Sequence, residues 1–212
     1  MTKYVSIIGN GESRRGFDLS PLKSFSTVVG CNAIHRDYFT EYLVCCDRHM
    51  CQQAVNNSSK NTTIYTRENW SGQFANWPNV KTLPALPYSG DQRKDEPFHW
   101  GTGPYAGVVG LTFKPKAIFM LGFDLHPIEK DVVNNLYKGT EGYTYIKRPV
   151  DPSYWIYQFH KLMGYSDPDV RWIVVNHERW EMPKEWKAHA NVFQETYEGM
   201  ARFINKQLTK SK

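Results

Sequence analysis

The chain has 212 residues, of which 41% are hydrophobic and 22% are charged, which is the composition of a globular protein and excludes a disordered one. Its net charge of +5 permits an anionic ligand without demanding a nucleic-acid partner. No apolar run approaches the roughly 18 residues of a membrane-spanning helix. The apolar stretch at the start of the sequence is shorter than that of a signal peptide. We expect one domain over residues 1–212 and no membrane span.

Four cysteines fall in one quarter of the chain, at Cys31, Cys45, Cys46 and Cys51. A secreted disulfide scaffold would spread its cysteines and would need a signal peptide. A zinc site combining His49 with the cysteines beside it matches no common ligand spacing. We therefore expect reduced thiols and a cytoplasmic protein.

The first half of the chain contains several short β-rich runs, each followed by small or polar residues. Ser20 before Pro21 is an N-cap signal that predicts a short helix between the first two runs. The predicted strands cover residues 4–8, 26–30, 41–46, 62–66 and 80–83.

The second half predicts further alternation of helices and strands. A helix rich in small residues opens at Gly101, and Asp151 caps a later helix. A long polar and aromatic loop, at about 126–150, should cover the site as a small lid. The predicted strands cover residues 116–122 and 169–176, and the predicted helices cover 104–111, 154–163 and 192–208.

Strands that alternate with helices, several of them apolar on both faces, are typical of a parallel sheet buried between two helix layers. The predicted fold class is α/β, a doubly wound and mostly parallel sheet with helices on both faces. Ligands of such sheets bind at the carboxyl ends of the strands, so residues just past each strand become the first candidates for a site.

The first candidate is the segment from Gly9 to Gly16, which follows the first strand. Its two leading glycines let the backbone approach a phosphate, successive N–H groups can form an anion nest, and Arg14 and Arg15 add charge. The segment lacks the third glycine of the dinucleotide fingerprint and the Gly-Lys-Ser/Thr of a P-loop. It indicates either nucleotide contact or a plain strand-to-helix turn.

The second candidate is the helix start at Gly101–Pro104. A helix N-terminus with a threonine hydroxyl suits a phosphate or a carboxylate, although a proline-capped start needs no ligand. Metal-dependent glycosyltransferases hold an ion with Asp-x-Asp after a strand, but Asp167–Asp169 precedes one and lies at the wrong end of the sheet. We expect no metal.

Histidine is the usual general base near neutral pH, and three of the seven histidines follow or approach strand ends or lie near the predicted lid: His126, His160 and His177. The lid carries Tyr137 and Tyr143, whose hydroxyls can donate to phosphate without adding charge. A packed aromatic loop without a ligand is the alternative interpretation.

Four motifs in order resemble the bacterial and viral sialyltransferase-type glycosyltransferases. They are the segment Ile7–Ser13, the strand end Val29–Asn32, the helix start Gly101–Pro104 and the strand Ala117–Asp124. In that family the corresponding sequences are Gly-Asn-Gly-Pro-Ser, Arg-Cys-Asn, Thr-Ser-Gly and Gly-Ile-Asp. The resemblance spans about residues 4–125 and implies a Rossmann-like domain with a small lid that uses a CMP-sugar donor without metal and inverts the anomeric centre.

The resemblance also implies a donor site, position by position. The first loop would line it, Asn32 and Asp47 would face the ribose or sugar, Thr102 and Gly103 would hold sugar or phosphate, and Tyr137 and Tyr143 would bind the leaving phosphate. The loop residues concerned are Gly9, Asn10, Gly11 and Ser13.

The sequence departs from the family at several of these positions. Glu12 replaces a proline, Asp47 stands where an asparagine is expected, and Gly103 replaces a serine. The family's catalytic histidine lies between the lid and the next helix, where residues 148–155 contain none. The candidates for the base are then His160, Asp151 and His126.

The sequence thus predicts a metal-independent, inverting glycosyltransferase that moves a sugar from a nucleotide-sugar donor to an acceptor hydroxyl. The resemblance implies that the donor is CMP-linked, and we expect no cofactor besides that co-substrate. The acceptor is a glycan or a hydroxylated base in viral DNA, for which Arg93, Lys94, Lys138, Lys147 and Arg148 are candidate phosphate contacts. The alternatives are a pyrophosphokinase-like nucleotide transferase and a non-catalytic nucleotide-binding module.

Overall fold

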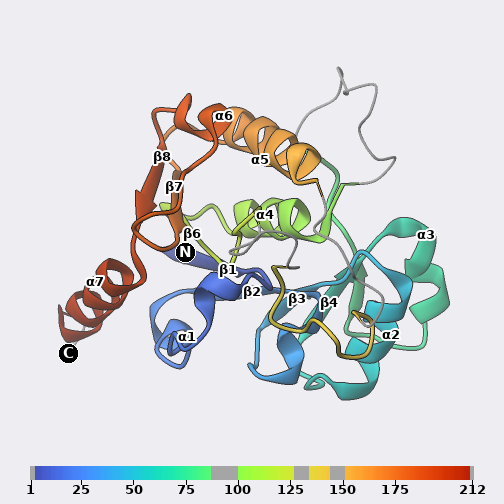
Figure 1. The fold of residues 1–212 in the computed structure, drawn as a ribbon. Coiled ribbons are helices and arrows are strands. Elements are labelled where there is room, and N and C mark those ends of the chain that lie inside the picture. The colour runs from blue at the N-terminus through green and yellow to red at the C-terminus, as the bar shows by residue number, and fades with distance from the viewer. Residues whose placement is uncertain (1–2, 87–99, 127–133, 144–150, 211–212) are drawn as a thin grey trace.

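A computed structural model describes residues 3–86, 100–126, 134–143 and 151–210. Their centre is one eight-stranded sheet in which every neighbouring pair is parallel, in the order β5-β4-β3-β2-β1-β6-β7-β8 (Figure 1). The predicted α/β fold class is therefore confirmed. The strands are β1 Tyr4–Ile8, β2 Thr27–Cys31, β3 Tyr42–Val44, β4 Thr63–Thr66, β5 Val80–Thr82, β6 Ala117–Leu121, β7 Arg171–Val175 and β8 Val192–Glu195.

Helices connect the strands, and several of the described elements differ from the sequence prediction. The predicted closing helix begins later, because Val192–Glu195 forms β8 and pairs in parallel with β7. Helix α2 follows β3 where none was predicted. The helices are α1 Leu22–Phe25, α2 Arg48–Asn57, α3 Glu68–Ser71, α4 Thr102–Thr112, α5 Ser153–Tyr165, α6 Lys184–Lys187 and α7 Tyr197–Lys210, with 3₁₀ turns η1 Glu12–Arg14, η2 Asn32–Arg36 and η3 Gly72–Phe74.

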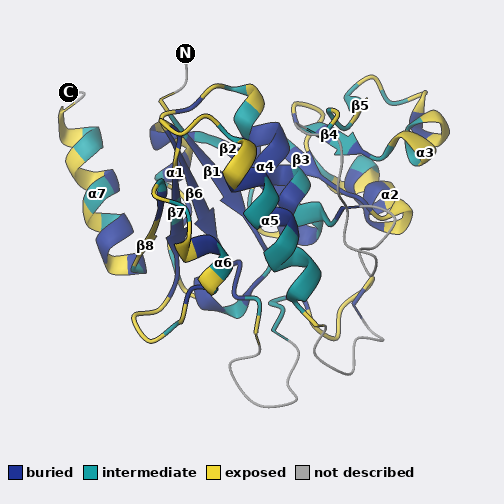
Figure 2. Ribbon diagram, turned by 90° about the horizontal axis from the view of Figure 1, so that it is seen from above, coloured by how far each residue is buried: buried dark blue, intermediate teal, exposed yellow. Residues whose placement is uncertain are grey.

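Two hydrophobic cores lie on opposite faces of the sheet. In β6 every residue is buried, and alternate side chains enter the two cores: Phe119 and Leu121 join one, Ile118 and Met120 the other. Helices α4, α5 and α6 cover one face, and α1, α2 and α7 cover the other (Figure 1). The central strands β1, β2 and β6 are accordingly dark blue over most of their length in Figure 2. Burial on both faces explains why these strands read as continuous apolar runs.

The chain reverses its direction across the sheet between β1 and β6. From β1 it steps outward through β2, β3, β4 and β5, and then it crosses back to place β6 on the other side of β1. The loops after β1 and β6 consequently diverge, and ligands of open α/β sheets bind at such a point. Where they leave the sheet, the two loops still lie close together: a Cβ on Gly9 would clash with the carbonyl oxygen of Gly122.

Part of the predicted lid is described. Residues 134–143 lie over the carboxyl edge of the sheet, where the N–H of Leu136 donates to the carbonyl of Asn10 at 2.8 Å. Residues 127–133 and 144–150 of the predicted lid lie outside the described residues. The four cysteines are buried free thiols. No helix in the described ranges has the length and apolarity needed to cross a bilayer.

Candidate functional site

A cleft of about 360 Å³ opens at the carboxyl edge of the sheet, across the point where the strand order reverses. Its walls come from the residues that follow β1, β2, β3, β4 and β6, from the starts of α4 and α5, and from the lid segment. A volume of this size suits a small-molecule ligand. The lining residues are Gly9–Gly11, Cys31, Asn32, Cys46, Asp47, Arg67, Gly101–Pro104, Gly122–Leu125, Asn134, Asn135, Tyr143, Tyr154, Trp155 and Phe159.

The β1 end of the cleft carries a pair formed by Asn10 and Tyr143. The Asn10 Nδ2 group donates to the Tyr143 hydroxyl at 3.0 Å, while the Asn10 Oδ1 atom is buried and has no partner among the described residues. Burial is the main cause that raises the pKa of Tyr143 well above its usual range, so its hydroxyl stays protonated at neutral pH. This end of the cleft therefore offers an unsatisfied acceptor and an uncharged hydroxyl.

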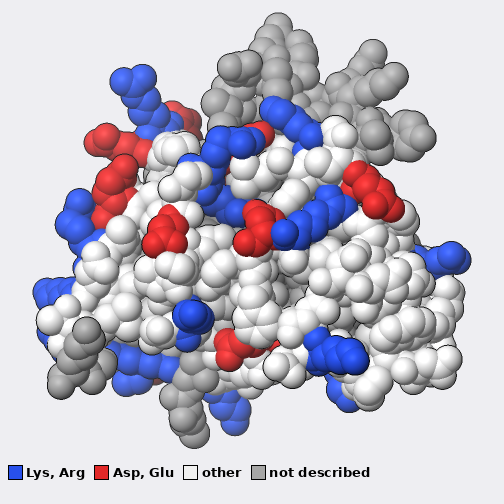
Figure 3. Space-filling view, turned by 90° about the horizontal axis from the view of Figure 1, so that it is seen from below, with Lys and Arg blue, Asp and Glu red and all other residues white. Residues whose placement is uncertain are grey.

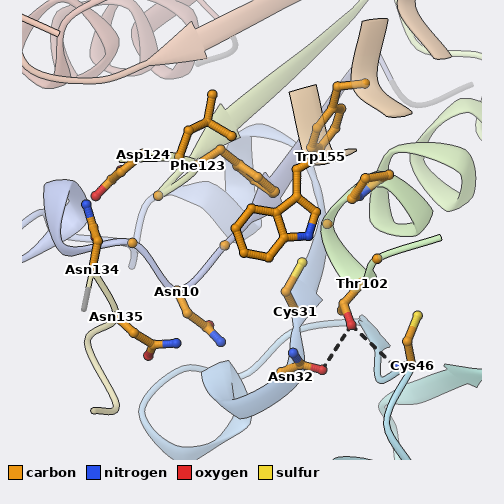
Figure 4. A pocket seen from close by; sticks show the side chains of 18 of the residues that line it. Asn10, Cys31, Asn32, Cys46, Thr102, Phe123, Asp124, Asn134, Asn135 and Trp155 are labelled. Carbon is orange, nitrogen blue, oxygen red and sulfur yellow. Dashed lines mark hydrogen bonds between the residues drawn. The ribbon is translucent and has the colours of Figure 1, made fainter. Parts of the chain in front are cut away.

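The middle of the cleft is tied together by Thr102, at the start of α4. Its hydroxyl donates to Asn32 Oδ1 at 3.3 Å and accepts from the N–H of Cys46 at 3.4 Å, as the dashed lines in Figure 4 show. Asn32 has a φ of 49°, in the left-handed region that asparagine tolerates better than most residues. These contacts hold the ends of β2 and β3 against α4.

The loop after β1 does not form the anion nest that the sequence predicts. Its N–H groups are already engaged within the protein, at 2.8–2.9 Å, by two carbonyls at the end of β6 and by the side chains of Asn134 and Asp124. The donors concerned are those of Gly9, Gly11, Glu12 and Ser13. The close approach of β1 and β6 uses these N–H groups, which favours the other interpretation of the segment, a strand-to-helix turn. Gly9, Asn10 and Gly11 still line the cleft.

Ser13 lies behind the cleft wall and supports Asp124. The Ser13 N–H donates to Asp124 Oδ2 at 2.8 Å, and its hydroxyl contacts Asp124 Oδ1 and lies 2.9 Å from the Tyr197 hydroxyl. Asn176 Nδ2 also donates to Asp124, at 3.4 Å. Asp124 is thus a buried carboxylate that fixes the loop after β1, and Ser13 is not among the residues that line the cleft.

Of the two predicted lid tyrosines, only Tyr143 lines the cleft. The Tyr137 hydroxyl donates to Asp37 and accepts from Arg14 Nη2 at 2.9 Å. Arg14 is itself buried, and its Nε donates to the Gly9 carbonyl at 2.8 Å. The cation of Arg14 is therefore used to pin the loop after β1, and Arg15 is exposed and paired with Glu12.

The predicted bases do not meet at the cleft. His160 lies on α5, with its Nδ1 3.0 Å from the Glu185 carbonyl and 2.9 Å from His189 Nε2. Asp151 accepts hydrogen bonds from the N–H and hydroxyl of Ser153, which is the capping role its sequence suggests. His126 is exposed after β6. None of the three lines the cleft, although the His126 carbonyl accepts from Asn134 Nδ2 at 2.6 Å at its edge.

The cleft contains further residues that the sequence analysis did not select. Phe123 and Trp155 present their rings between the Asn10 side and the Thr102 side of the cleft (Figure 4). Arg67 follows β4, and Tyr154 precedes Trp155 at the start of α5. The rule that polar residues past strand ends line the site could have selected Arg67. No local signal marks the two aromatic residues of α5.

Carboxylates are few in the described part of the cleft. They are Asp124, which is engaged as above, and Asp47, which precedes α2 and is exposed. Among the described residues, no three His, Cys, Asp or Glu side chains come together in an arrangement that could hold a metal ion. Asp167 accepts from the N–H of Asp169 at 2.9 Å in a turn before β7.

A parallel α/β sheet with a ligand-sized cleft at its point of reversal defines the Rossmann-like class. No family model matches the sequence, and no curated protein matches it. Among solved structures, the chain is similar to the sialyltransferase CST-II in complex with a trisaccharide acceptor and CMP: 15% identity over 81% of this chain and 80% of that one, with a TM-score of 0.51. It is also similar to CstII from Campylobacter jejuni in complex with cytidine-5'-monophosphate, at 16% identity over 81% and 79%, with a TM-score of 0.51. At these identities the likeness shows the fold.

Proposed function

We propose that the protein is a glycosyltransferase that takes a nucleotide-sugar donor, CMP-linked, into the cleft at the carboxyl edge of the sheet. One observation carries the proposal: the cleft lies at the reversal point between β1 and β6 in a chain that shares its fold with sialyltransferases solved with CMP. The cleft is also large enough for such a donor and combines aromatic rings with uncharged hydrogen-bonding groups.

The residues of the cleft suit the parts of a nucleotide sugar. The rings of Phe123 and Trp155 offer faces for a base or a sugar. Asn10, with its free buried oxygen, can accept from an amino or hydroxyl group, and the neutral hydroxyl of Tyr143 can donate to an oxygen of the nucleoside. Asn32 and Thr102 can contact sugar hydroxyls at the centre of the cleft.

The proposal assigns the general base to Asp47. Aspartate side chains are ordinarily ionised at neutral pH, and Asp47 is the cleft carboxylate that accepts no side-chain or capping hydrogen bond from any described residue. In the reaction a carboxylate oxygen of Asp47 takes the proton of the acceptor hydroxyl. At the same time the oxygen of that hydroxyl attacks the anomeric carbon. The bond from this carbon to the phosphate oxygen breaks, and the electron pair leaves with CMP. No step of this scheme uses a metal ion.

The acceptor in this proposal is a glycan hydroxyl. A hydroxylated DNA base is the other predicted acceptor, and it would require a basic surface. On the face seen in Figure 3, Lys and Arg side chains are interspersed with Asp and Glu. Among the described cations, Lys138 and Arg15 both pair with Glu12. Arg93, Lys94, Lys147 and Arg148 lie outside the described residues. DNA binding that weakens steeply with salt would favour the DNA acceptor over the glycan.

The experiment that tests the donor class is a thermal-shift screen of nucleotides and nucleotide sugars. A ligand at about 100 times its dissociation constant adds about 2.7 kcal/mol, which is about 5–10 °C for a chain of this size. We expect the shift with CMP and CMP-sugars and little with guanine or adenine nucleotides. A screen in which no cytidine nucleotide raises the melting temperature would contradict the proposal.

A second assay separates transfer from the alternatives. We expect CMP release and a glycosylated acceptor in the presence of a chelator, and a strong loss of both for Asp47→Asn with CMP affinity kept. A strict magnesium requirement would instead favour the nucleotide transferase. Tight CMP binding with neither donor hydrolysis nor transfer would favour the non-catalytic module. The observation that favours this module is that the described cleft residues include no histidine.

A further inference from the structure

Charged side chains are scarce in the described part of the cleft. Its lining contains two carboxylates, Asp47 and Asp124, and one cation, Arg67. A nucleotide phosphate brings at least one negative charge into this cleft, and a site without metal must balance it with a cation or with oriented N–H dipoles. We propose that Arg67 binds the phosphate of the nucleotide at the start of α4, an inference that rests on the proposed function.

The position of Arg67 is fixed by the protein, so its guanidinium is held in place before a ligand arrives. Arg67 follows β4, and its Nη2 donates to the Trp100 carbonyl at 2.8 Å. Trp100 directly precedes Gly101, at the start of α4. The Nε atom is shielded from solvent and has no hydrogen-bond partner among the described residues. A buried donor without a partner is costly, and a bound anion would satisfy it.

No described residue compensates the charge of Arg67. No carboxylate of the described residues lies within ion-pair distance of its guanidinium. The Cys46 thiol lies beside it, but burial raises the pKa of this thiol to about 11, even though Thr102 and Arg67 act in the opposite direction. Cys46 is therefore a neutral neighbour at physiological pH. The guanidinium remains a fork of donors facing a cleft that is open to a ligand.

The start of α4 supplies the second half of the phosphate site. Gly101 to Pro104 line the cleft at the N-terminus of α4, a helix of 11 residues. The positive end of the helix dipole therefore faces the cleft. The first N–H groups of a helix have no partner within the helix, and no described residue accepts from those of Thr102 and Gly103. Gly103 lies close under Phe123, where a Cβ would come within 2.7 Å of the ring.

The first glycine loop cannot take this role, because four of its N–H groups donate to the end of β6, Asn134 and Asp124. Nor can Arg14, which is committed to the Gly9 carbonyl and to Tyr137. The available donors and the available cation therefore coincide at the start of α4. This places the phosphate nearer to the β3 and β4 side of the cleft than the sequence motif at Gly9–Gly11 suggests.

The test compares CMP with cytidine, which lacks the phosphate, by titration calorimetry on the full chain. For wild-type protein we expect CMP to bind more tightly than cytidine. Arg67→Met should weaken CMP binding by about 10- to 100-fold, as expected for a lost charge-assisted contact, and should change cytidine binding by less than about threefold. Arg67→Lys, which keeps the charge but not the fork, should lie between the two. The control is Arg48→Met, on the exposed first turn of α2, and it should change neither affinity.

The outcomes separate the inference from the proposed function. Equal losses for CMP and cytidine in Arg67→Met, or no loss for either, would overturn the assignment of Arg67 to the phosphate. A loss confined to the CMP-sugar, with CMP unaffected, would assign Arg67 to the sugar and would also overturn it. If Arg67→Met does not fold, the Arg67→Lys comparison decides by the same ratio. Wild-type protein that binds neither CMP nor cytidine would contradict the proposed function itself.

Discussion

At the scale of single residues, the cleft is held open by contacts that leave no space for an extra methyl group. A Cβ built on Gly11 would lie 2.5 Å from the Asp124 carboxyl carbon and 2.6 Å from both of its oxygens. Asp124 cannot retreat without breaking its bonds to Ser13. Glycine is required at this position because two loops meet there and leave no room for a Cβ.

Gly11→Ala should therefore destabilise the protein by about 1–3 kcal/mol, the usual cost of forcing an atom into a packed contact. The measurement is the free energy of unfolding in urea. Gly72→Ala is the matched control: Gly72 has helical dihedral angles and nothing within 4 Å of its added Cβ. It should leave the stability unchanged or raise it by about 0.4–1 kcal/mol. Equal stabilities of the two variants would contradict this account of the loop.

Ser13 offers a second test, because the sequence assigns it to the donor and the structure places it behind the wall. Ser13→Ala removes the hydroxyl that contacts Asp124 and Tyr197 and leaves buried partners unsatisfied, so it should cost about 1–3 kcal/mol of stability. CMP affinity, measured at a temperature where the variant is folded, should change by less than about threefold. A large loss of affinity with unchanged stability would return Ser13 to the donor site.

At the scale of elements, an arginine of η2 adds several bonds to those that fasten the described lid segment 134–143 to the body. Arg36 Nη1 donates to Thr140 at 2.7 Å, and its Nη2 donates to the Glu141 carbonyl at 2.7 Å and to Gln53 of α2. These bonds bring Tyr143 to Asn10. The position of the Tyr143 hydroxyl thus depends on a residue that does not line the cleft.

Arg36→Ala should loosen this segment and leave the sheet intact. We expect faster amide hydrogen exchange over residues 134–143, unchanged exchange in β1 and β6, and weaker CMP binding. The comparison variant is Arg202→Ala, on the exposed side of α7. Faster exchange spread over the whole chain in Arg36→Ala, or no change in the segment, would show that Arg36 does not fasten it.

The elements also show how far the sequence alone predicts this molecule. Seven strands and the fold class follow from short β-rich runs, and in a central strand such as β6 burial on both faces leaves a continuous apolar run. The strand β8 is not predicted, because its residues fit the helical spacing that continues with Tyr197 and Met200. Its pairing with β7, which the local sequence does not show, makes it a strand. Its position at the sheet edge also leaves Phe193 44% exposed.

The site is predicted less completely than the fold. Gly9, Asn10, Asn32 and Thr102 follow from strand ends and helix starts, which are local features. The engaged N–H groups of the first loop, the inward position of Tyr137 and the cleft position of Trp155 depend on how distant segments meet. Such meetings leave no pattern in one stretch of sequence.

At the scale of the whole molecule, the sheet places two cores back to back and carries several buried tyrosine hydroxyls at its carboxyl edge. Burial raises the pKa of Tyr197 to about 12, and it raises those of Tyr137 and Tyr143 further. Between pH 10 and 12 these phenols stay protonated in the folded chain, whereas in the unfolded chain they release their protons. Because the folded state then holds more protons, stability falls as the pH rises.

We therefore expect the melting temperature, followed by circular dichroism, to decrease steeply above about pH 10, where unfolded tyrosines ionise. Tyr197→Phe should lower the melting temperature at neutral pH, because Ser13 and the Gly122 N–H lose a partner. It should also reduce the slope above pH 10, because one raised pKa is gone. A slope identical to that of the wild type would contradict the burial of this hydroxyl as the cause.

The central claim is that a cytidine nucleotide binds in the cleft between β1 and β6, and titration of CMP into wild-type and Asn10→Ala protein tests it most directly. Asn10 offers a buried, unpaired oxygen and holds Tyr143, and it lies at the reversal point. We predict one site per chain, at least about tenfold weaker binding in Asn10→Ala, and unchanged binding in the exposed control Asn205→Ala. No binding to the wild type, or equal affinity in all three proteins, would contradict the claim.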